Sequence, residues 1–364
     1  MEQKKLGFGL MRLPVLADGQ IDLEQVKQMA DLFLANGFTY FDTSFVYHNG
    51  QSEHAMRQAV VERYPRDSFT IATKFPTFAV QSEDQVDGIF EQQLQNLGTD
   101  YIDYYLLHTL NTKFYNGTDG NGGVVKTCHL FDHARKWKAE GKIRHMGFSF
   151  HDSAEVLDQI LTENPDVEFV QIIINHFDWE SCFIQSKACY DVIRKHGKQV
   201  VVMEPVKGGV LAENAGMALR FAASQEGVLT VLSGMSNMEQ MEDNVNTMRD
   251  FVPLTAEEQT ALLSGAKAIK AAGPVKMSDF KKYESLRYHG IPVSSLLDGY
   301  NSCMVQPNPG FAGELNYLAN ELLKLGVTDL KQPFPAETVT LDGKDITPMV
   351  KEAWDFLIEH SFAL

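Results

Sequence analysis

Three side chains that can carry charge or protons stand at the ends of consecutive apolar segments. Asp42 and Lys74 each close such a segment, and His108 directly follows the next one. Their spacings of 32 and 34 residues each match one strand–helix unit, so we expect three neighbouring parallel strands to bring them to one edge. Tyr47 follows Asp42 by five residues. The pattern predicts a carboxylate, an amine, an imidazole and a phenol around one mouth.

This set of groups can transfer a proton to a carbonyl oxygen. A phenol with a pKa near ~10 is a poor acid at neutral pH. We expect the Lys74 ammonium to lower the pKa of Tyr47, and Asp42 to hold that ammonium in its charged form. A neutral His108 could orient the carbonyl. None of the four can donate hydride, so this chemistry requires a cofactor.

Each residue also has a plain structural interpretation. Asp42 could cap the next segment, Lys74 could be a solvated strand end, His108 a core histidine, and Tyr47 a packing aromatic among 12 tyrosines. Three such coincidences on consecutive strand ends are a weaker explanation than a shared site.

The elements that must position these groups alternate along the first part of the chain. We expect helices to open at Asp22, Ser82 and Thr255, each followed three residues later by Gln or Glu in a capping pattern. Strands are expected at 38–42, 69–74, 102–107, 142–148, 168–174, 199–203, 229–233 and 250–252. This alternation predicts an α/β fold, a (β/α)8 TIM barrel. The alternative, a doubly wound open sheet, would carry a Gly-rich turn after its first strand, where this chain has Asp42-Thr43-Ser44.

Composition excludes several classes of protein. The 364 residues carry a formal net charge of −16, which opposes binding to nucleic acid. The sequence has no apolar run of ~18 residues, so we expect no membrane span and no signal peptide. The four cysteines, Cys128, Cys182, Cys189 and Cys303, lack metal-ligand spacing. We expect a cytoplasmic protein without a metal site.

The pattern changes near Ala271-Ala272-Gly273-Pro274. We therefore expect a barrel over 1–270 and a mostly helical C-terminal extension over 271–364, with helices near 278–288, 313–325 and 348–360. Apolar residues of the extension could close over the mouth or form a dimer contact, or simply pack among themselves. These residues are Phe311, Leu315, Leu318, Leu322 and Leu325.

Several motifs together resemble the aldo-keto reductase superfamily over about residues 6–270. They are Phe41-Asp42-Thr43-Ser44, Tyr47 with Gly50 and Glu53, Thr73-Lys74, Leu106-Leu107-His108, Gly147-Phe148-Ser149, Gln171, Glu204-Pro205-Val206-Lys207-Gly208-Gly209, and Ser233-Gly234-Met235-Ser236 through Asn244. The resemblance implies a barrel that binds NADPH or NADH without a Rossmann domain and transfers hydride to an aldehyde or ketone. It makes Tyr47 the general acid, Lys74 its activator, Asp42 the partner of Lys74, and His108 the group that orients the carbonyl.

The resemblance also implies a cofactor shell. Ser149 and Gln171 would bind the carboxamide, with Phe150 where Asn is common, and Met203 would replace the usual aromatic beneath the ring. The glycine-containing loop from 205 to 211 would cross the pyrophosphate, and Asn244 would contact adenine. The full set is Met11, Arg12, Asp42, Ser149, Gln171, Met203, Pro205, Lys207, Gly208, Gly209, Leu211, Gly234, Ser236, Gln240 and Asn244.

Two departures from the family pattern affect the cofactors. NADPH-specific members place Lys and Arg where this chain has Gly234 and Gln240, so we expect dual or NADH-leaning use. The chain resembles a bacterial branch whose members often end in an iron–sulfur domain. The corresponding region here has only Cys303, which cannot hold a four-cysteine cluster, so no cluster is expected.

Three functions remain open at this point. The first is an NAD(P)H-dependent reductase of a small carbonyl substrate, acting as a monomer or homodimer. The alternatives are a non-catalytic nicotinamide-binding subunit that senses redox state, and an interaction barrel without cofactor. Specificity should reside in residues 109–127 and the extension, with an apolar wall drawn from Phe45, Phe78, Phe114 and Tyr115.

Overall fold

The computed structural model describes residues 4–118, 120–277, 280–309 and 315–361. At its centre, eight parallel strands pair in chain order and close into a barrel where β8 meets β1. This confirms the predicted (β/α)8 architecture. The strands are β1 (Leu6–Gly9), β2 (Tyr40–Asp42), β3 (Thr70–Phe75), β4 (Ile102–Leu110), β5 (Ile143–Phe150), β6 (Phe169–Ile173), β7 (Gln199–Met203) and β8 (Val228–Gly234).

One of the predicted strands was wrong. Residues 250–252 form no strand; they lie in the connection between two helices, where Phe251 packs against the barrel core. The missing strand is β1, which pairs with both β2 and β8. It has four residues, of which Gly7 and Gly9 are two. Because glycine is depleted in strands, β1 shows almost no strand pattern in the sequence.

Helices surround the barrel between successive strands. The predicted N-cap at Asp22 is present, since its Oδ1 accepts from the Gln25 backbone N–H at 3.1 Å, and Thr255 forms a full capping box. The helix expected from Ser82 begins with a 3-10 turn instead. No described helix is long and apolar enough to cross a bilayer. The helices are α1 (Leu23–Ala35), α2 (Ser52–Met56), α3 (Val86–Leu97), α4 (Thr112–Asn116), α5 (Val124–Thr127), α6 (Leu130–Ala139), α7 (Ala154–Glu163), α8 (Ser186–Lys195), α9 (Ala215–Ala223), α10 (Met238–Arg249) and α11 (Ala256–Ala271).

The register of the sheet turns three functional side chains to the same side. Asp42 pairs with Ala72 on β3, and Lys74 pairs with Leu106 on β4. Lys74 therefore lies two positions beyond Ala72, the partner of Asp42. In the same way, His108 lies two positions beyond Leu106, the partner of Lys74. Because side chains alternate along a strand, steps of two keep Asp42, Lys74 and His108 on the inner face as the barrel staggers.

The C-terminal extension begins where α11 ends. The predicted helices 313–325 and 348–360 are confirmed as α13 and α14, but α12 was not anticipated. The helix expected at 278–288 was wrong: within its described part, 281–283 form one 3-10 turn and β9 follows. The elements are β9 (Arg287–Tyr288), β10 (Ile291–Pro292), α12 (Val293–Met304), α13 (Leu315–Lys324), β11 (Thr340–Leu341), β12 (Lys344–Asp345) and α14 (Thr347–His360).

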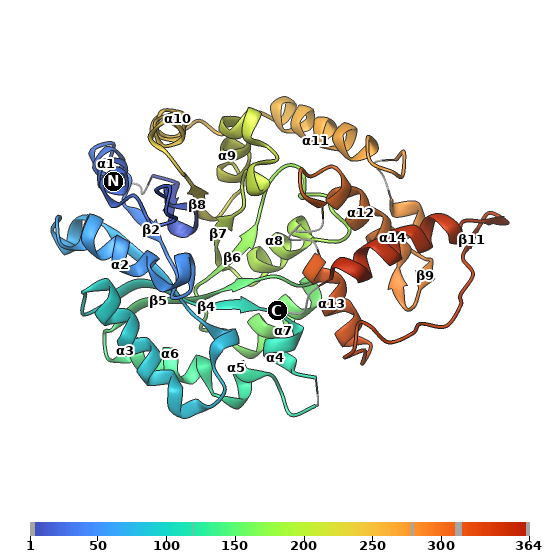
Figure 1. Cartoon of the computed structure of the whole chain (residues 1–364), viewed down its shortest axis with the longest axis horizontal. Coiled ribbons are helices and arrows are strands. Elements are labelled where there is room, and N and C mark those ends of the chain that lie inside the picture. The colour runs from blue at the N-terminus through green and yellow to red at the C-terminus, as the bar shows by residue number, and fades with distance from the viewer. Residues whose placement is uncertain (1–3, 119, 278–279, 310–314, 362–364) are drawn as a thin grey trace.

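The extension shares an apolar core with the barrel. Its helices lie together beside the barrel, coloured orange to red (Figure 1). Their core includes the buried Leu318 and Leu322, and it also takes in Ile173 and Met203 from the ends of β6 and β7. Leu325 is 52% exposed, whereas Phe311 and the side chain of Leu315 lie outside the described residues. The extension therefore packs against the mouth end of the barrel.

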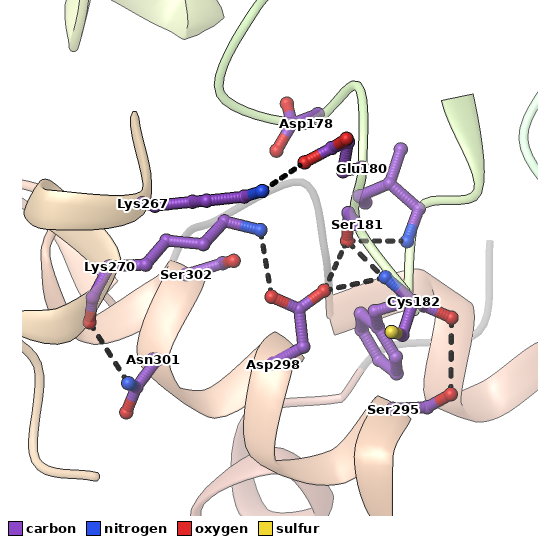
Figure 2. A network of polar contacts seen from close by, with 12 residues as sticks. Asp178, Glu180, Ser181, Cys182, Lys267, Lys270, Ser295, Asp298, Asn301 and Ser302 are labelled. Atoms are coloured by element: carbon purple, nitrogen blue, oxygen red, sulfur yellow. Dashed lines mark hydrogen bonds and ion pairs between the residues drawn. The ribbon is translucent and has the colours of Figure 1, made fainter. Parts of the chain in front are cut away.

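A buried ionic junction fixes this contact. The Asp298 carboxylate on α12 accepts from Lys270 Nζ at 2.7 Å, from Ser181 Oγ at 2.6 Å and from the Cys182 backbone N–H at 2.8 Å (Figure 2). Lys270 lies in the last turn of α11, and Ser181 and Cys182 lie between β6 and α8. One carboxylate thus joins the extension to two barrel elements.

Candidate active site

The structure brings Asp42, Tyr47, Lys74 and His108 together at the carboxyl ends of β2, β3 and β4. Lys74 Nζ pairs with the Asp42 carboxylate and donates to the Thr43 carbonyl at 2.9 Å. The same Nζ lies 4.9 Å from the centroid of the Tyr47 ring. Lys74 is fully buried. An ammonium held by a carboxylate therefore sits against the phenol, in the arrangement expected from the spacing.

Burial and ion pairing act in opposite directions on the pKa values of Lys74 and Asp42. Burial alone would lower the pKa of Lys74, but Asp42 and Tyr47 raise it above its ordinary value. Burial raises the pKa of Asp42, and the Lys74 charge offsets part of that rise. The two groups stabilise each other as an ion pair.

The pKa of Tyr47 departs from the expectation. Burial raises it and Asp42 and Glu204 add to the rise, whereas Lys74 lowers it without cancelling the effect. The net direction is thus opposite to the one expected from residue types, because a sequence reveals the neighbouring ammonium but not the loss of water. The phenol stays protonated at neutral pH.

His108 is a neutral, oriented ring. Burial lowers its pKa well below the ordinary value, and the charges of Lys74 and His151 lower it further. Its Nδ1 lies 3.2 Å from Ser44 Oγ, and its ring meets that of Tyr47 edge-on at a centroid distance of 5.9 Å. Ser44, which the sequence analysis did not single out as a functional residue, therefore fixes one ring nitrogen and leaves Nε2 for other partners.

A second buried carboxylate supports the strand that carries Lys74. Glu53 accepts from Thr73 Oγ1 at 2.7 Å, Gln93 Nε2 at 2.8 Å and Asn96 Nδ2 at 2.9 Å. Gln93 also donates to the Lys74 carbonyl at 3.1 Å. Glu53 thereby ties α2 and α3 to β3, directly behind the ammonium.

Strands β5 and β6 present two polar side chains, Ser149 and Gln171, that could bind an amide. Ser149 Oγ accepts from the Thr109 backbone N–H at 2.7 Å, so its own hydrogen remains available. Gln171 Oε1 is buried and has no hydrogen-bond partner among the described residues, while its Nε2 lies 3.6 Å from Met203 Sδ. Because a carboxamide has both a donor and an acceptor, these residues fit a nicotinamide.

The loop expected over the pyrophosphate follows β7. Gly208 and Gly209 adopt φ values of 60° and 104°, a region that favours glycine. Lys207 is buried, with Nζ at 2.8 and 3.0 Å from the two Asp178 oxygens, and Leu211 is buried in an apolar cluster. Lys207 therefore holds the loop, and the backbone from Pro205 onward is what the structure offers to a phosphate.

A cation from the segment after β1 lies at the corner where β8 ends. A Cβ built on Gly234 would lie 3.2 Å from Arg12 Cβ, and one built on Gly208 would lie 3.7 Å from the Arg12 guanidinium. Glycine at 234 thus leaves room for the Arg12 side chain, which reaches toward the loop. Neighbouring Met11 is 59% exposed.

Polar residues of the β8–α10 turn complete this corner. Ser236 Oγ donates to the Arg12 carbonyl at 3.0 Å, and the Ser236 N–H donates to Gln240 Oε1 at 2.8 Å. Asn244 Nδ2 donates to Ser233 Oγ at 2.9 Å. The residues expected at the adenosine end are therefore gathered at one place.

A cavity of about 80 Å³ lies away from the four central residues, at the junction with the extension. Its charges are paired, with Lys267 at 2.8 Å from Glu180 and Lys270 at 2.7 Å from Asp298. Within the described ranges, no group of three or more His, Cys, Asp or Glu residues is arranged to hold a metal ion.

A profile of the Aldo/keto reductase family matches residues 5–216. This chain belongs to the aldo/keto reductase family. Membership confirms the superfamily predicted from the motifs and, with it, the class of enzyme, an NAD(P)H-dependent oxidoreductase. The matched residues include Asp42, Tyr47, Lys74 and His108, and also Ser149, Gln171 and Met203.

Individual aldo/keto reductase relatives are distant. An uncharacterized oxidoreductase of Bacillus subtilis, YqkF, is 24% identical over 318 residues, covering 73% of this chain and 97% of that protein. A probable voltage-gated potassium channel subunit beta of Arabidopsis thaliana is 22% identical over 314 residues, covering 70% and 93%. A solved aldo-keto reductase from Klebsiella pneumoniae in complex with NADPH has a TM-score of 0.56 at 20% identity, covering 72% and 94%. The structural likeness shows the shared fold.

Proposed function

We propose that this aldo/keto reductase reduces an aldehyde or ketone to an alcohol with Tyr47 as the proton donor. The observation that carries the proposal is the buried Asp42–Lys74 pair against the Tyr47 ring, with a neutral His108 beside it. Bound reduced nicotinamide supplies the hydride. The chain supplies binding, orientation and the proton.

The proton follows a short path. The Ser44 hydroxyl suits His108 Nδ1 as a donor, which places the ring proton on Nε2, where it can bind the substrate oxygen. As hydride adds to the carbonyl carbon, the C=O π electrons move to the oxygen, which takes the proton of Tyr47. Lys74 stabilises the resulting phenolate, and Asp42 holds Lys74. The same groups run the reverse reaction on an alcohol.

The remaining shell residues would hold the cofactor. Ser149 and Gln171 would bind the carboxamide, and Met203 would pack against the ring, as a thioether can. The loop after β7 would follow the pyrophosphate. Arg12, with Gln240, would face the phosphate end, so we propose that both NADPH and NADH are used.

The exposed aromatic surface supports a substrate with an apolar group. Phe78 is 41% exposed, and its ring centroid lies 5.6 Å from that of His108; Phe45 is half-buried. Phe114 and Tyr115 are buried, and Tyr115 OH donates to Glu163 at 2.7 Å. Phe78 is therefore the residue best placed to form the expected apolar wall.

Turnover tests this proposal directly. The purified chain is mixed with NADPH or NADH and a panel of aldehydes and ketones while the absorbance of reduced nicotinamide is followed. We expect its loss to require a carbonyl compound and to disappear in Tyr47→Phe. Cofactor binding without turnover on the whole panel would overturn the proposal.

That last outcome would favour a second function. A non-catalytic nicotinamide-binding subunit that senses redox state is supported by the likeness to a potassium channel subunit beta. In that case the bound cofactor would alter association with a partner protein, and Tyr47→Phe would leave that association unchanged.

A further inference from the structure

One imidazole at the mouth is not used by the proposed mechanism. His151 directly follows β5, the strand beside the one that carries His108. No hydrogen bond to its ring is found among the residues that the structure describes, and the side chain is partly exposed. A polar ring that is neither buried in a network nor fully solvated is available to a ligand.

Strand alternation indicates which way His151 faces. Phe148 and Phe150 belong to the core between the barrel and its helices, and Phe148 packs on Phe131 of α6 at a ring distance of 6.2 Å. Ser149 therefore faces inward, and His151 shares its side of the strand. The His151 N–H donates to the Leu110 carbonyl at 3.1 Å, so the pairing of β4 and β5 continues to this point.

His108 lies on β4 and His151 directly follows the neighbouring strand β5, and a positive charge on His151 would lower the pKa of His108. Burial lowers the pKa of His151 to about 4. Both rings are therefore neutral at neutral pH. His108 offers Nε2 to a ligand, because Ser44 holds Nδ1, and His151 offers one donor and one acceptor. Two such rings on adjacent strands can bind two oxygen atoms of one small molecule.

The extension holds His151 in place. Asn320 Nδ2 on α13 donates to the His151 carbonyl at 2.9 Å. Lys324, one turn later, binds Asp152 at 2.9 Å and Ser153 Oγ at 2.8 Å. Asp152 in turn accepts from the Thr112 N–H at 2.7 Å. The backbone around His151 is thus fixed from both the barrel and the extension, as a recognition residue requires.

We propose that His151 is a specificity-determining residue that binds a second substrate oxygen next to the carbonyl held by His108. The substrate class is then an aldehyde or ketone with a hydroxyl group on the adjacent carbon. This inference rests on the proposed reductase function and narrows its substrate.

The test compares two aldehydes of nearly equal shape, lactaldehyde with its adjacent hydroxyl and isobutyraldehyde with a methyl in its place. We expect His151→Phe to lower the kcat/KM ratio of lactaldehyde to isobutyraldehyde roughly tenfold, the worth of about one hydrogen bond to a substrate hydroxyl. His151→Gln, which keeps a donor and an acceptor, should restore most of the ratio. His145→Phe, on the same strand at the opposite end of the barrel, is the matched control and should leave the ratio unchanged.

The outcomes separate this inference from the one on which it rests. If the wild type reduces no carbonyl compound of the panel, the reductase proposal fails. If it reduces other carbonyl compounds but not lactaldehyde, only the present inference is overturned. If it reduces both aldehydes and His151→Phe lowers both equally, or only raises KM for NADPH, then His151 does not read the hydroxyl and the inference is overturned. Should the Phe variant not fold, the wild type must still be inhibited more strongly by the diol product than by isobutanol; equal inhibition overturns the inference.

Discussion

The Lys74 ammonium lies 4.9 Å from the centre of the Tyr47 ring, yet the pKa of Tyr47 is raised rather than lowered because burial outweighs the nearby charge. A protonated phenol beside a fixed cation is ready to give up its proton only when the substrate oxygen gains negative charge. The Lys74 ammonium therefore stabilises Tyr47 most strongly after proton transfer, when Tyr47 is a phenolate.

Tyr47→Phe removes the proton donor while keeping the ring. We expect kcat to fall at least ~100-fold, in the range typical for loss of a general acid, with cofactor Kd changed by less than about threefold because the phenol oxygen alone is lost. Steady-state kinetics and cofactor fluorescence titration measure the two quantities. Tyr101→Phe, at a tyrosine packed between Arg66 and Arg144, is the control. Near-normal turnover in Tyr47→Phe contradicts the assignment.

Lys74→Met leaves the Asp42 carboxylate buried without its cation. Removal of one partner of a buried pair costs roughly 3–5 kcal/mol of unfolding free energy, so urea denaturation should show a large loss. The double variant Asp42→Asn with Lys74→Met should lose clearly less than the sum of the single losses, because the groups are coupled. Additive losses would show that the pair is not the stabilising unit.

Arg12→Ala removes the cation at the corner where β8 ends. A phosphate contact with an ionised donor is worth more than a neutral one, so we expect KM for NADPH to rise roughly tenfold, and KM for NADH to change by less than about threefold. Arg249→Ala, at the far end of α10, serves as the control. Equal effects on both cofactors would place Arg12 away from the additional phosphate of NADPH.

Asp298→Asn should loosen the extension from the barrel. The change leaves Lys270 buried beside a neutral amide, and we expect a loss of roughly 3–5 kcal/mol with faster proteolysis after residue 271. Asp191→Asn, which breaks the exposed Lys187–Asp191 pair, should have little effect. If both variants melt alike, the junction does not hold the extension.

Two histidines with lowered pKa values, His108 and His151, predict a pH dependence of stability. Burial lowers the pKa of His108 well below its ordinary value and that of His151 to about 4. An unfolded imidazole binds a proton near pH ~6.5, so below that pH the unfolded state binds more protons and stability falls as pH falls. Unfolding in urea between pH ~6 and ~5 should take up about one proton fewer in His151→Phe than in the wild type. An unchanged slope would show that His151 titrates normally when folded.

The sequence predicted the parts of the fold that depend on local pattern. Asp22 and Thr255 cap helices where expected, since a capping residue acts over one turn. The short strand β1 was not predicted from the sequence. Its pairing partners lie 30 or more residues away, and its glycines do not give the apolar pattern of a strand. β1 can be recognised only from its pairing with β2 and β8 in the folded barrel.

The candidate site, too, could be predicted only in part from the sequence. Residue types and spacing predicted that Asp42, Lys74 and His108 would meet, because strand order fixes their positions. Burial decided the direction of the Tyr47 pKa, and no motif reports burial. The role proposed for His151 has no signal in the sequence, because this residue belongs to none of the quoted motifs. It is suggested by the inward face of β5 and by the contact from α13.

The apolar core shared by α12, α13 and α14 reaches Met203, whose sulfur meets the amide of Gln171. A barrel cut after residue 271 would expose to water the side of Met203 that the extension covers. A variant with an altered substrate preference should therefore keep the last ninety or so residues, because they cover the ends of β6 and β7.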